Sequence, residues 1–431
     1  MQRPAFSCLF LALSQKICYD KEHERGAQME VLVVGGGAAG MACAIAAAER
    51  GFCVTIAEKM DRVGKKLLAT GNGRCNLMNT GAWRYPCGSD FAQSVLNQCG
   101  AGEQRLFWQQ LGLRLREEDG GRVYPASGQA ATVLDTLRVA LALRGVNIRT
   151  GCPVEDIRPA RRGFTVLLGG QQMHADRIVI ACGGMAQPKL GSDGSALRLL
   201  KNLGHTLRPC TPALTALNCD MKPLAGLSGI RVKAEVSVLQ SGVCAHREYG
   251  EVLFTDYGLS GVCVMNSAAY ASLPGSEISL NLLPALGLSS IEDAIAELHR
   301  RHEAWRILPM EQLLTGLCAA RLSSALCKAA GVNWKERSIS SLTAKETQRL
   351  ACTIADFRVP VKALRGFEQA QVTRGGAACA EFDPCTLQSR LVPGLYAVGE
   401  ALDVDGECGG FNLMFAFGSG LVAGRKMEES I

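Results

Sequence analysis

The sequence lacks the residue clusters of metal-binding and disulfide-bonded proteins. It has 431 residues but only six scattered histidines, and none of its 19 cysteines belongs to a C-x-x-C pair. Zinc sites and redox-active dithiols need such clusters, so we expect no metal site and no catalytic disulfide. The chain is long and its cysteine count is odd, unlike a small disulfide-bonded secreted domain. We therefore expect reduced cysteines and a cytoplasmic protein.

The sequence also lacks a strong charge of one sign. Charged residues make up 20% of it, the net charge is +6, and there is no long Lys/Arg block. Nucleic-acid-binding domains usually carry a clustered basic surface, so we expect a small-molecule substrate and no nucleic-acid partner. Nothing in the sequence determines the oligomeric state.

No segment has the pattern of a membrane span. Residues 31–48 are uncharged, but three consecutive glycines at 35–37 predict a strand, a turn and a helix instead. Residues 5–13 are apolar, yet the run is short and lacks a small-residue cleavage site before the charged residues 21–25. We expect residues 1–28 to be a disordered extension, or the product of an upstream start codon.

From Glu30 onward the chain has the alternating pattern of an α/β protein. A β-branched run at 31–34 precedes the glycine turn and an alanine-rich helix to about Arg50, and a second strand at 53–57 ends at Glu58. Uninterrupted apolar strands predict a parallel sheet that is buried on both faces. The same domain continues with a helix at about 131–144, a strand pair at 146–168 and a buried strand at 178–181.

The motif Gly35-x-Gly37-x-x-Gly40 lies between the first strand and the first helix, where a dinucleotide-binding fingerprint belongs. Gly35 would permit the tight turn, Gly37 the approach of the backbone to a pyrophosphate, and Gly40 close packing of helix on strand. The phosphates would meet the free N–H groups of the helix N-terminus. Glu58, 18 residues past Gly40, would accept hydrogen bonds from ribose hydroxyls.

Three features favour FAD over NAD. The fingerprint opens the ordered chain, and no second such motif follows a strand. The segment 396–400 predicts a buried strand that ends in a glycine and an acid, suited to a ribityl hydroxyl at the carboxyl edge of a sheet. Residues 409–412 lead into a glycine-rich helix whose N-terminus would stabilise an anionic reduced flavin. The alternative for this last block is an ordinary packing helix.

The pattern changes near Pro209. Residues 211–283 show short alternating runs that predict an antiparallel sheet or a small barrel, and residues 289–356 predict helices with Ser289, Ser341 and Thr343 as starts. The predicted fold class is α/β, a Rossmann-type FAD-binding domain interrupted by a β-barrel-like plus helical insertion. The expected bounds are 29–207 and 373–431 for the two parts of the FAD-binding domain, 208–285 for the barrel-like part, 286–356 for the helices and 357–372 for the return strands.

These motifs resemble the aminoacetone oxidase family of FAD-binding enzymes, which includes 3-dehydro-bile acid delta(4,6)-reductases. The resemblance covers nearly everything from Met29 to Ala423, and its most specific stretches are GKKLLATGNGRCNLMNT at 64–80, LFTDYGLSG at 253–261, TRGGA at 373–377 and the block at 394–420. One departure is Val262, where the family pattern continues with proline. The departure leaves FAD binding intact and affects substrate details.

The resemblance implies a cofactor site drawn from three parts of the chain. The turn at 71–76 also suits an anion or a flavin edge because it combines amide donors with a cation, although a structural Asn-Gly turn is the alternative. The implied FAD contacts are Gly35, Gly37, Ala38, Ala39, Gly40, Glu58, Lys65, Lys66, Gly71, Asn72, Gly73, Arg74, Cys75, Asn76, Gly399, Glu400, Asp403, Gly410, Asn412 and Leu413.

The resemblance further implies NAD(P)H-linked reduction of a conjugated C=C bond in a 3-oxo bile acid or steroid-like substrate. A donor to the substrate oxygen and a proton source are then needed, and the candidates are Tyr257, Tyr124, Arg74 and Cys75. All four residue types are also common in structural roles. Two other hypotheses remain open: an amine or aminoketone oxidase that uses O2, and an RNA-associated flavoprotein.

Overall fold

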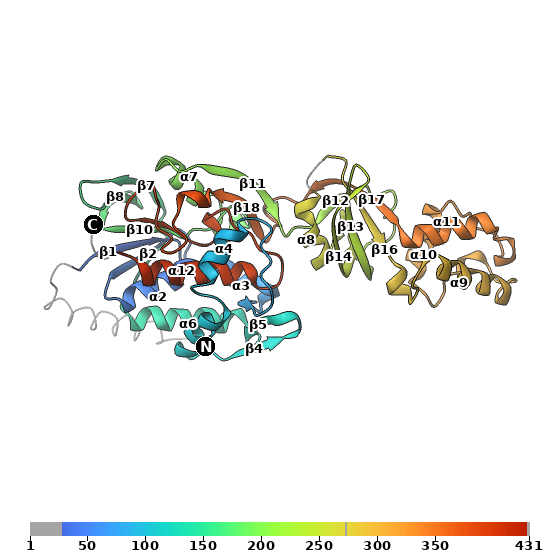
Figure 1. The fold of residues 1–431 in the computed structure, drawn as a ribbon, viewed down its shortest axis with the longest axis horizontal. Coiled ribbons are helices and arrows are strands. Elements are labelled where there is room, and N and C mark those ends of the chain that lie inside the picture. Colours follow the sequence, from blue (N-terminus) through green and yellow to red (C-terminus); the bar gives the residue numbers. More distant parts are fainter. Residues whose placement is uncertain (1–27, 272–273, 429–431) are drawn as a thin grey trace, which may run out of the picture. The chain divides into compact units, whose positions relative to one another are not determined.

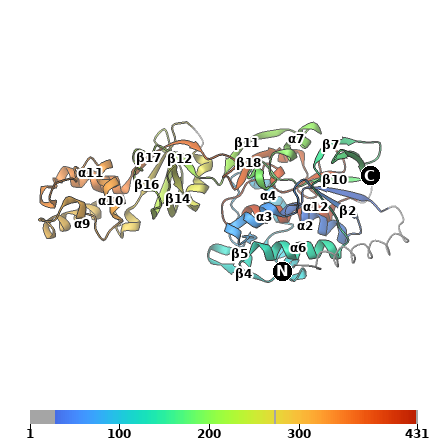
Figure 2. The same ribbon diagram turned by 180° about the vertical axis from the view of Figure 1, so that it is seen from behind.

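The structure is a computed structural model that describes residues 28–271 and 274–428. The predicted disordered extension therefore lies outside the described residues, except for its last position. The chain divides into two compact units. Unit 1 comprises residues up to Thr211 and from Gln371 onward, and unit 2 comprises Pro212–Ala370. In Figures 1 and 2 the first and last parts of the chain, blue and red, belong to the same unit.

The centre of unit 1 is a parallel sheet in the strand order β19-β10-β1-β2-β6. Strands β1 and β10 are buried along almost their whole length, as their continuous apolar sequences predict. The strands are β1 (Glu30–Val34), β2 (Cys53–Glu58), β6 (Asn147–Thr150), β10 (Arg177–Ile180) and β19 (Leu395–Ala397).

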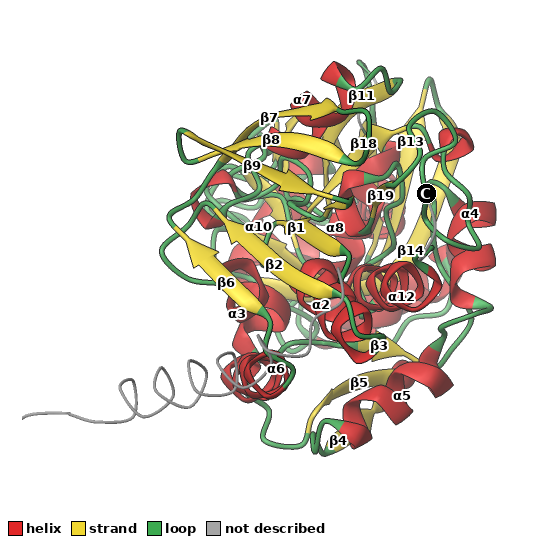
Figure 3. Cartoon of the chain, turned by 90° about the vertical axis from the view of Figure 1, so that its left-hand side faces the viewer, coloured by secondary structure: helices red, strands yellow, loops and turns green. Residues whose placement is uncertain are grey.

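Helices cover one face of this sheet and a second, antiparallel sheet covers the other (Figure 3). The predicted strand pair at 146–168 is wrong in one respect, because three strands form there: the first joins the parallel sheet and the other two join the antiparallel one. The covering elements are α2 (Ala38–Glu49), α6 (Ala130–Leu143) and α12 (Phe411–Lys426) on one face, and β7 (Val154–Pro159), β8 (Phe164–Leu168) and β9 (Gln171–Ala175) on the other.

The remaining elements of unit 1 are short strands and helices outside the central sheet. A small antiparallel sheet, β3-β5-β4, carries the GRVYP segment, and a two-stranded ribbon, β11-β18, marks where the chain leaves and re-enters unit 1. These elements are α3 (Lys65–Ala69), β3 (Met78–Asn79), α4 (Ser89–Leu96), α5 (Ala101–Gln110), β4 (Leu115–Glu118), β5 (Arg122–Pro125), α7 (Ser195–Asn202), β11 (Leu207–Ala213) and β18 (Val372–Ala377).

Unit 2 begins with a closed barrel in the order β12-β15-β14-β13-β16-β17. Closure removes the exposed strand edges that a small antiparallel sheet would otherwise present. The elements are β12 (Leu217–Cys219), β13 (Arg231–Gln240), β14 (Val243–Phe254), β15 (Gly258–Ser260), α8 (Val262–Ser267), β16 (Glu277–Asn281) and β17 (Phe357–Leu364). The predicted fold class, a Rossmann-type α/β domain with a barrel and helical insertion, is confirmed.

Between β16 and β17 the chain forms the helices α9 (Ile291–Ala304), α10 (Ala320–Ala329) and α11 (Ala344–Ala355). Helix α9 starts one residue later than predicted, because Ser290 and not Ser289 accepts the capping hydrogen bond. Thr343 caps α11 as predicted, in a capping box with Glu346. Ser341 ends a short 3-10 turn before this cap. No helix among the described residues is long and apolar enough to cross a membrane.

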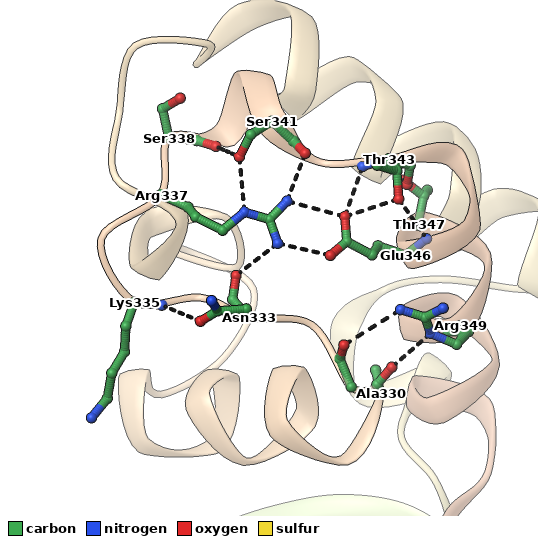
Figure 4. A network of polar contacts seen from close by, with 11 residues as sticks. Ala330, Asn333, Lys335, Arg337, Ser338, Ser341, Thr343, Glu346, Thr347 and Arg349 are labelled. Carbon is green, nitrogen blue, oxygen red and sulfur yellow. Dashed lines mark hydrogen bonds and ion pairs between the residues drawn. The ribbon is translucent and has the colours of Figure 1, made fainter.

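Arg337 ties the segment before α11 to its first turn (Figure 4). Its guanidinium donates to both carboxylate oxygens of Glu346, at 2.8 and 3.1 Å, and to the carbonyl oxygen of Ser341. The hydrogen bond from Arg337 lowers the pKa of Glu346 to about 2, below its ordinary value of 4.5. A carboxylate whose folded-state pKa is lowered stabilises the fold above its ordinary pKa, and this contribution is lost as the pH falls.

Arg337→Met should therefore lower the free energy of unfolding by about 1 to 3 kcal/mol at neutral pH, since Glu346 loses its charged donor. The difference from wild type should shrink as the pH falls from 4.5 towards 2. Urea titrations at neutral pH and at about pH 3 measure it. Arg349→Met is the control, because Arg349 donates to the carbonyl oxygen of Ala330 and not to an acid. Equal pH dependence in both variants would contradict the prediction.

Candidate active site

The fingerprint turn between β1 and α2 leaves no room for side chains at two of its glycines. Gly35 has a φ of +107°, and a Cβ there would lie 2.6 Å from the Cα atom of Cys182. A Cβ at Gly40 would overlap the carbonyl oxygen of Gly35. These glycines therefore hold the start of α2 against the ends of β1 and β10, which agrees with the roles that their spacing suggests.

Gly37 differs from Gly35, Gly36 and Gly40 because the described residues leave the position of a Cβ there almost free. A Cβ at Gly37 would meet only the carbonyl oxygen of Ala181, at 3.9 Å. Gly37 is the N-cap of α2, no side chain caps this helix, and no acidic residue lies in its first turn. An uncapped helix N-terminus presents N–H groups and a positive dipole end. This open, electropositive position fits a pyrophosphate.

Glu58 lies at the end of β2, and backbone amides hold its carboxylate in place. Its Oε2 accepts from the N–H of Gly36 and its Oε1 from the N–H of Met60, both at 2.8 Å. The side chain is largely buried. Each oxygen keeps a second lone pair, so the carboxylate can also accept hydrogen bonds from a ribose. The geometry of Glu58 thus fits the adenosine end of FAD.

The loop at 70–76 follows α3 and has an unusual backbone. Gly71, Asn72, Gly73 and Cys75 all have positive φ, between 55° and 80°. For residues other than glycine this conformation is uncommon and strained, and strain of this kind concentrates at functional sites. The Oδ1 atom of Asn76 is buried and accepts no hydrogen bond from any described residue. It is an acceptor that a bound ligand could satisfy.

The C-terminal block meets both of the other segments. A Cβ at Gly399 would lie 3.0 Å from the Cβ of Ala39, and a Cβ at Gly410 would lie 2.7 Å from Asn76 Oδ1. Glu400 accepts from Lys66 Nζ at 2.8 Å and from the N–H of Thr373 at 2.9 Å. The fold therefore brings the fingerprint, the 70–76 loop and the C-terminal block together, although more than 300 residues separate the first and last of them.

Helix α12 uses its glycines for packing. A Cβ at Gly420 would overlap the carbonyl oxygen of Ala39, and one at Gly424 would lie 2.6 Å from the carbonyl oxygen of Cys43. An ordinary packing helix was the alternative that the sequence left open for residues 409–424, and these contacts show such packing. The N-terminus of α12 nevertheless lies beside Asn76, because its N-cap is Gly410. Its first turn contains no acidic residue.

The other predicted cofactor contacts have protein partners. Lys65 pairs with Asp61, and the carboxylate of Asp403 accepts from Cys87 Sγ at 3.1 Å. Asn412 closes the preceding loop by bonding both the N–H and the carbonyl oxygen of Gly406. Leu413 packs against the core of unit 1. The roles of these residues toward FAD stay predictions.

Three of the four catalytic candidates lie in unit 1, close in sequence or space to the 70–76 loop. The guanidinium carbon of Arg74 lies 4.1 Å from the ring centroid of Tyr124, and Arg74 forms an ion pair with Glu118. Cys75 is fully buried in the apolar core, and burial raises the pKa of its thiol to about 12. At neutral pH this thiol stays protonated and out of contact with solvent.

The fourth candidate, Tyr257, belongs to unit 2. It precedes β15, and the guanidinium carbon of Arg365 lies 4.1 Å from its ring centroid. The two tyrosines of the candidate set thus each stack against an arginine, in different units. His205, at the edge of the first part of unit 1, is buried between Glu381 at 2.9 Å and Ser389 at 3.0 Å, which indicates a structural role.

The sequence reasoning missed Thr373, Arg374 and Asp405. The hydroxyl of Thr373 accepts from the N–H groups of Met185 and Ala186, at 2.7 and 3.0 Å, and so joins β18 to the loop that follows β10. Arg374 forms a bidentate pair with the buried carboxylate of Asp405, at 3.0 and 2.9 Å. The TRGGA stretch marked this region, but only the tertiary contacts reveal what its side chains do.

Comparisons with known proteins identify the family. The model described as the HI0933-like protein Rossmann domain matches residues 29–426. The chain belongs to this family. The resemblance to the aminoacetone oxidase family is thereby confirmed, and the chain is an FAD-dependent oxidoreductase. Three observations fit FAD, the cofactor that the family implies. Asn76 Oδ1 is buried without a hydrogen bond among the described residues, the position at Gly37 is open, and backbone amides hold the carboxylate of Glu58.

Three curated relatives match over almost the whole chain. A 3-dehydro-bile acid delta(4,6)-reductase of Clostridium scindens is 37% identical over 92% of this chain and 98% of its own length. A ribosomal RNA dihydrouridine synthase of Escherichia coli is 28% identical over 91% and 96%, respectively. A ribosomal RNA dihydrouridine synthase of Haemophilus influenzae is 25% identical over 90% of this chain and 96% of its own length. Among residues 28–271 and 274–428, no cluster of three metal-ligating side chains occurs.

Gly37→Ala should weaken FAD binding without harming the fold. The backbone at Gly37, with φ −84° and ψ −171°, suits alanine, and its Cβ would enter open space. The stability of the FAD-free protein should change by less than about 0.5 kcal/mol. The added methyl group would occupy space next to the pyrophosphate and move it away from the backbone N–H groups. The loss of one amide–phosphate hydrogen bond in this way, worth about 1.5 to 3 kcal/mol, should reduce FAD affinity about 10-fold or more. Flavin fluorescence titration of the FAD-free protein measures the affinity.

Gly40→Ala is the matched control, because its Cβ would overlap the carbonyl oxygen of Gly35. It should lower the free energy of unfolding by about 1 to 3 kcal/mol in the FAD-free protein. Thermal unfolding followed by circular dichroism compares the two variants. Full FAD affinity in Gly37→Ala would show that the pyrophosphate does not lie against this turn.

Proposed function

We propose that this protein reduces a conjugated C=C bond in a 3-oxo bile acid or steroid-like substrate, with NAD(P)H as the reductant. The observation that carries the proposal is the 37% identity to a bile acid delta(4,6)-reductase over 92% of the chain and 98% of that relative. Such coverage includes both units, so the likeness extends to the parts that would recognise a substrate. The proposed reaction consumes the substrate, NAD(P)H and one proton, and yields NAD(P)+ and a product in which one C=C bond is saturated.

FAD, when bound, would carry the two electrons as hydride between nicotinamide and substrate. We assign its binding to the three segments that meet in unit 1. The N–H groups at the start of α2, from Gly37 to Gly40, would hold the pyrophosphate, and Glu58 would orient the adenosine ribose. Glu400, which Lys66 and the Thr373 amide already position, would accept from a ribityl hydroxyl.

The protein must also hold the carbonyl oxygen of the substrate and supply a proton. A phenol donates a hydrogen bond at neutral pH without a buried charge, so Tyr124 and Tyr257 suit these tasks best among the candidates. Arg74 is already engaged by Glu118 and by the ring of Tyr124, so we assign it to positioning Tyr124. The buried thiol of Cys75 is the least suited, since its pKa is about 12 and it is not exposed.

The ribosomal RNA relatives support a second candidate substrate. Dihydrouridine is uridine whose ring C=C bond is saturated, so the names of both groups of relatives describe saturation of a C=C bond. The RNA relatives are less identical, at 28% and 25%, but cover a similar share of the chain. The second candidate function is therefore the same reduction on a uracil base in RNA. The sequence-based expectation of no nucleic-acid partner stays a prediction.

Anaerobic stopped-flow absorbance of the FAD-loaded protein tests the proposal. The flavin is reduced with NADH or NADPH, and a 3-oxo-4-ene or 4,6-diene bile acid is then added. We expect rapid return of the oxidised flavin spectrum, because the substrate accepts the electrons. The enone absorbance of the 3-oxo-4-ene, or the dienone absorbance of the 4,6-diene, should be lost at the same time. The matched control is the saturated 3-oxo bile acid, which has no C=C bond to reduce and should leave the flavin reduced.

Two results would contradict this proposal. Flavin that reacts quickly with O2 and not with the enone would favour an amine or aminoketone oxidase. Flavin reoxidised by a uridine-containing ribosomal RNA fragment and not by the enone would favour the second candidate substrate. Each result identifies a different electron acceptor, so the three functions are distinguished within one set of measurements.

A further inference from the structure

Thr373 lies where three segments of unit 1 meet. It belongs to β18, and it is 1% exposed. Its hydroxyl oxygen accepts from the N–H groups of Met185 and Ala186, at 2.7 and 3.0 Å, and its own N–H donates to Glu400 Oε1 at 2.9 Å. One buried threonine therefore joins β18, the loop that follows β10 and the C-terminal block that contains Glu400.

The loop that follows β10 approaches Thr373 through a glycine. A Cβ at Gly184 would lie 2.5 Å from Thr373 Oγ1 and 3.0 Å from Glu400 Oε1, so a side chain at this position would displace one of them. Two residues earlier, the Cα atom of Cys182 would lie 2.6 Å from a Cβ at Gly35. The same loop thus contacts the fingerprint turn at one point and both polar groups at another.

The proton of the Thr373 hydroxyl has no acceptor among residues 28–271 and 274–428. A hydroxyl has one proton to donate and two lone pairs, and the N–H groups of Met185 and Ala186 occupy the lone pairs. No hydrogen bond in the described part of the chain has Thr373 Oγ1 as its donor. A buried donor without an acceptor is unfavourable, so this proton indicates a bound group that accepts it.

Two other buried threonines provide an internal comparison. Thr215 is 0% exposed and Thr347 is 2% exposed, and both belong to unit 2. The hydroxyl of Thr215 donates to the carbonyl oxygen of Arg365, and that of Thr347 donates to the carbonyl oxygen of Thr343, both at 3.2 Å. Among the buried threonines in the described part of the chain, Thr373 alone has a hydroxyl that only accepts.

We propose that Thr373 is a cofactor-binding residue whose hydroxyl donates a hydrogen bond to a ribityl oxygen of FAD. The choice of the ribityl chain rests on the proposed function, which assigns Glu400 to a ribityl hydroxyl. Such a hydroxyl is both a donor and an acceptor, so the two residues complement it: Glu400 accepts its proton, and Thr373 donates to its oxygen. The bond between the Thr373 amide and Glu400 orients both groups before FAD binds.

The test compares FAD with ADP, which contains the adenosine and pyrophosphate of FAD and lacks its riboflavin half. Thr373→Val keeps the size of the side chain and removes the hydroxyl. It should reduce the FAD affinity of the FAD-free protein about 5- to 30-fold, because a ribityl oxygen loses its donor. Its ADP affinity should change less than about 2-fold. Flavin fluorescence titration measures the first affinity, and calorimetry measures the second.

Three further variants complete the comparison. Thr373→Ser keeps the hydroxyl and should bind FAD within about 3-fold of the wild type. Thr347→Val removes a buried hydroxyl from unit 2 and should leave both affinities unchanged, which controls for the removal of a buried threonine hydroxyl. Thr373→Cys, whose thiol is a weak donor and acceptor, should also lose FAD affinity. It replaces Thr373→Val if the valine variant does not fold.

Thermal unfolding of the FAD-free variants separates stability from cofactor binding. Thr373→Val should be less stable than the wild type, since the N–H groups of Met185 and Ala186 lose their acceptor. Equal losses of FAD and ADP affinity would show that Thr373 only anchors the loop that follows β10. Unchanged FAD affinity would show that water accepts the hydroxyl proton. Either result would overturn the proposal.

The visible absorption spectrum of bound FAD locates the contact within the riboflavin half. We expect the same spectrum for wild type and Thr373→Val at saturating FAD, because a ribityl contact leaves the flavin ring untouched. A shifted spectrum in Thr373→Val, absent from Thr373→Ser, would place the contact at the ring and overturn the ribityl assignment.

FAD binding needs no substrate, so failure of this proposal is distinguishable from failure of the proposed function. If the wild type reduces no enone, but Thr373→Val loses affinity for FAD and not for ADP, the proposed function fails and the contact stands. If the wild type reduces the enone and Thr373→Val binds FAD as tightly as the wild type does, the contact fails and the function stands.

Discussion

The candidate site depends on backbone contacts that only glycine permits. Gly40 brings the start of α2 against the carbonyl oxygen of Gly35, and Gly420 brings α12 against the carbonyl oxygen of Ala39. With a Cβ at either position the helices would move away from the sheet and from each other. The N-terminus of α2 would then no longer face the carboxyl edges of β1 and β10. The electropositive position at Gly37 is therefore a consequence of close packing elsewhere in the turn.

A second feature of the site is that its acids are held by amides and by one lysine, in ways that leave lone pairs free. Glu58 accepts from two backbone N–H groups, and Glu400 accepts from Lys66 and from the amide of Thr373. A carboxylate held in this way is oriented before any ligand binds, yet it can still accept hydrogen bonds from hydroxyls. Asp405, by contrast, is buried against Arg374 and serves to anchor β18.

Relatives of this chain carry names that describe different substrates. The two matches cover 92% and 91% of this chain, and the names describe a bile acid and a ribosomal RNA.

The sequence by itself determined the local elements of this protein, because their signals are short-range. The periodicity of apolar residues, the β-branched runs and the spacing of glycines predict β1, α2 and β2. The capping box at Thr343 marks the start of α11. The long motifs also indicated the family. Strand pairing was less predictable: residues 146–168 read as one strand pair, but their strands belong to two sheets. The alternation of apolar and polar residues along a strand does not reveal which other strand it pairs with.

Only the tertiary structure decided which of the candidate residues meet and what each one touches. The contact of Gly410 with Asn76 joins segments more than 300 residues apart, and Arg374 pairs with Asp405 across 31 residues. The burial of Cys75 is likewise a result of the packing around it. Arg365 carried no motif at all, and its place beside Tyr257 follows from β12 lying between β15 and β17. Such contacts depend on the register of a closed barrel and on helix packing distances, and no local pattern of residues encodes either of them.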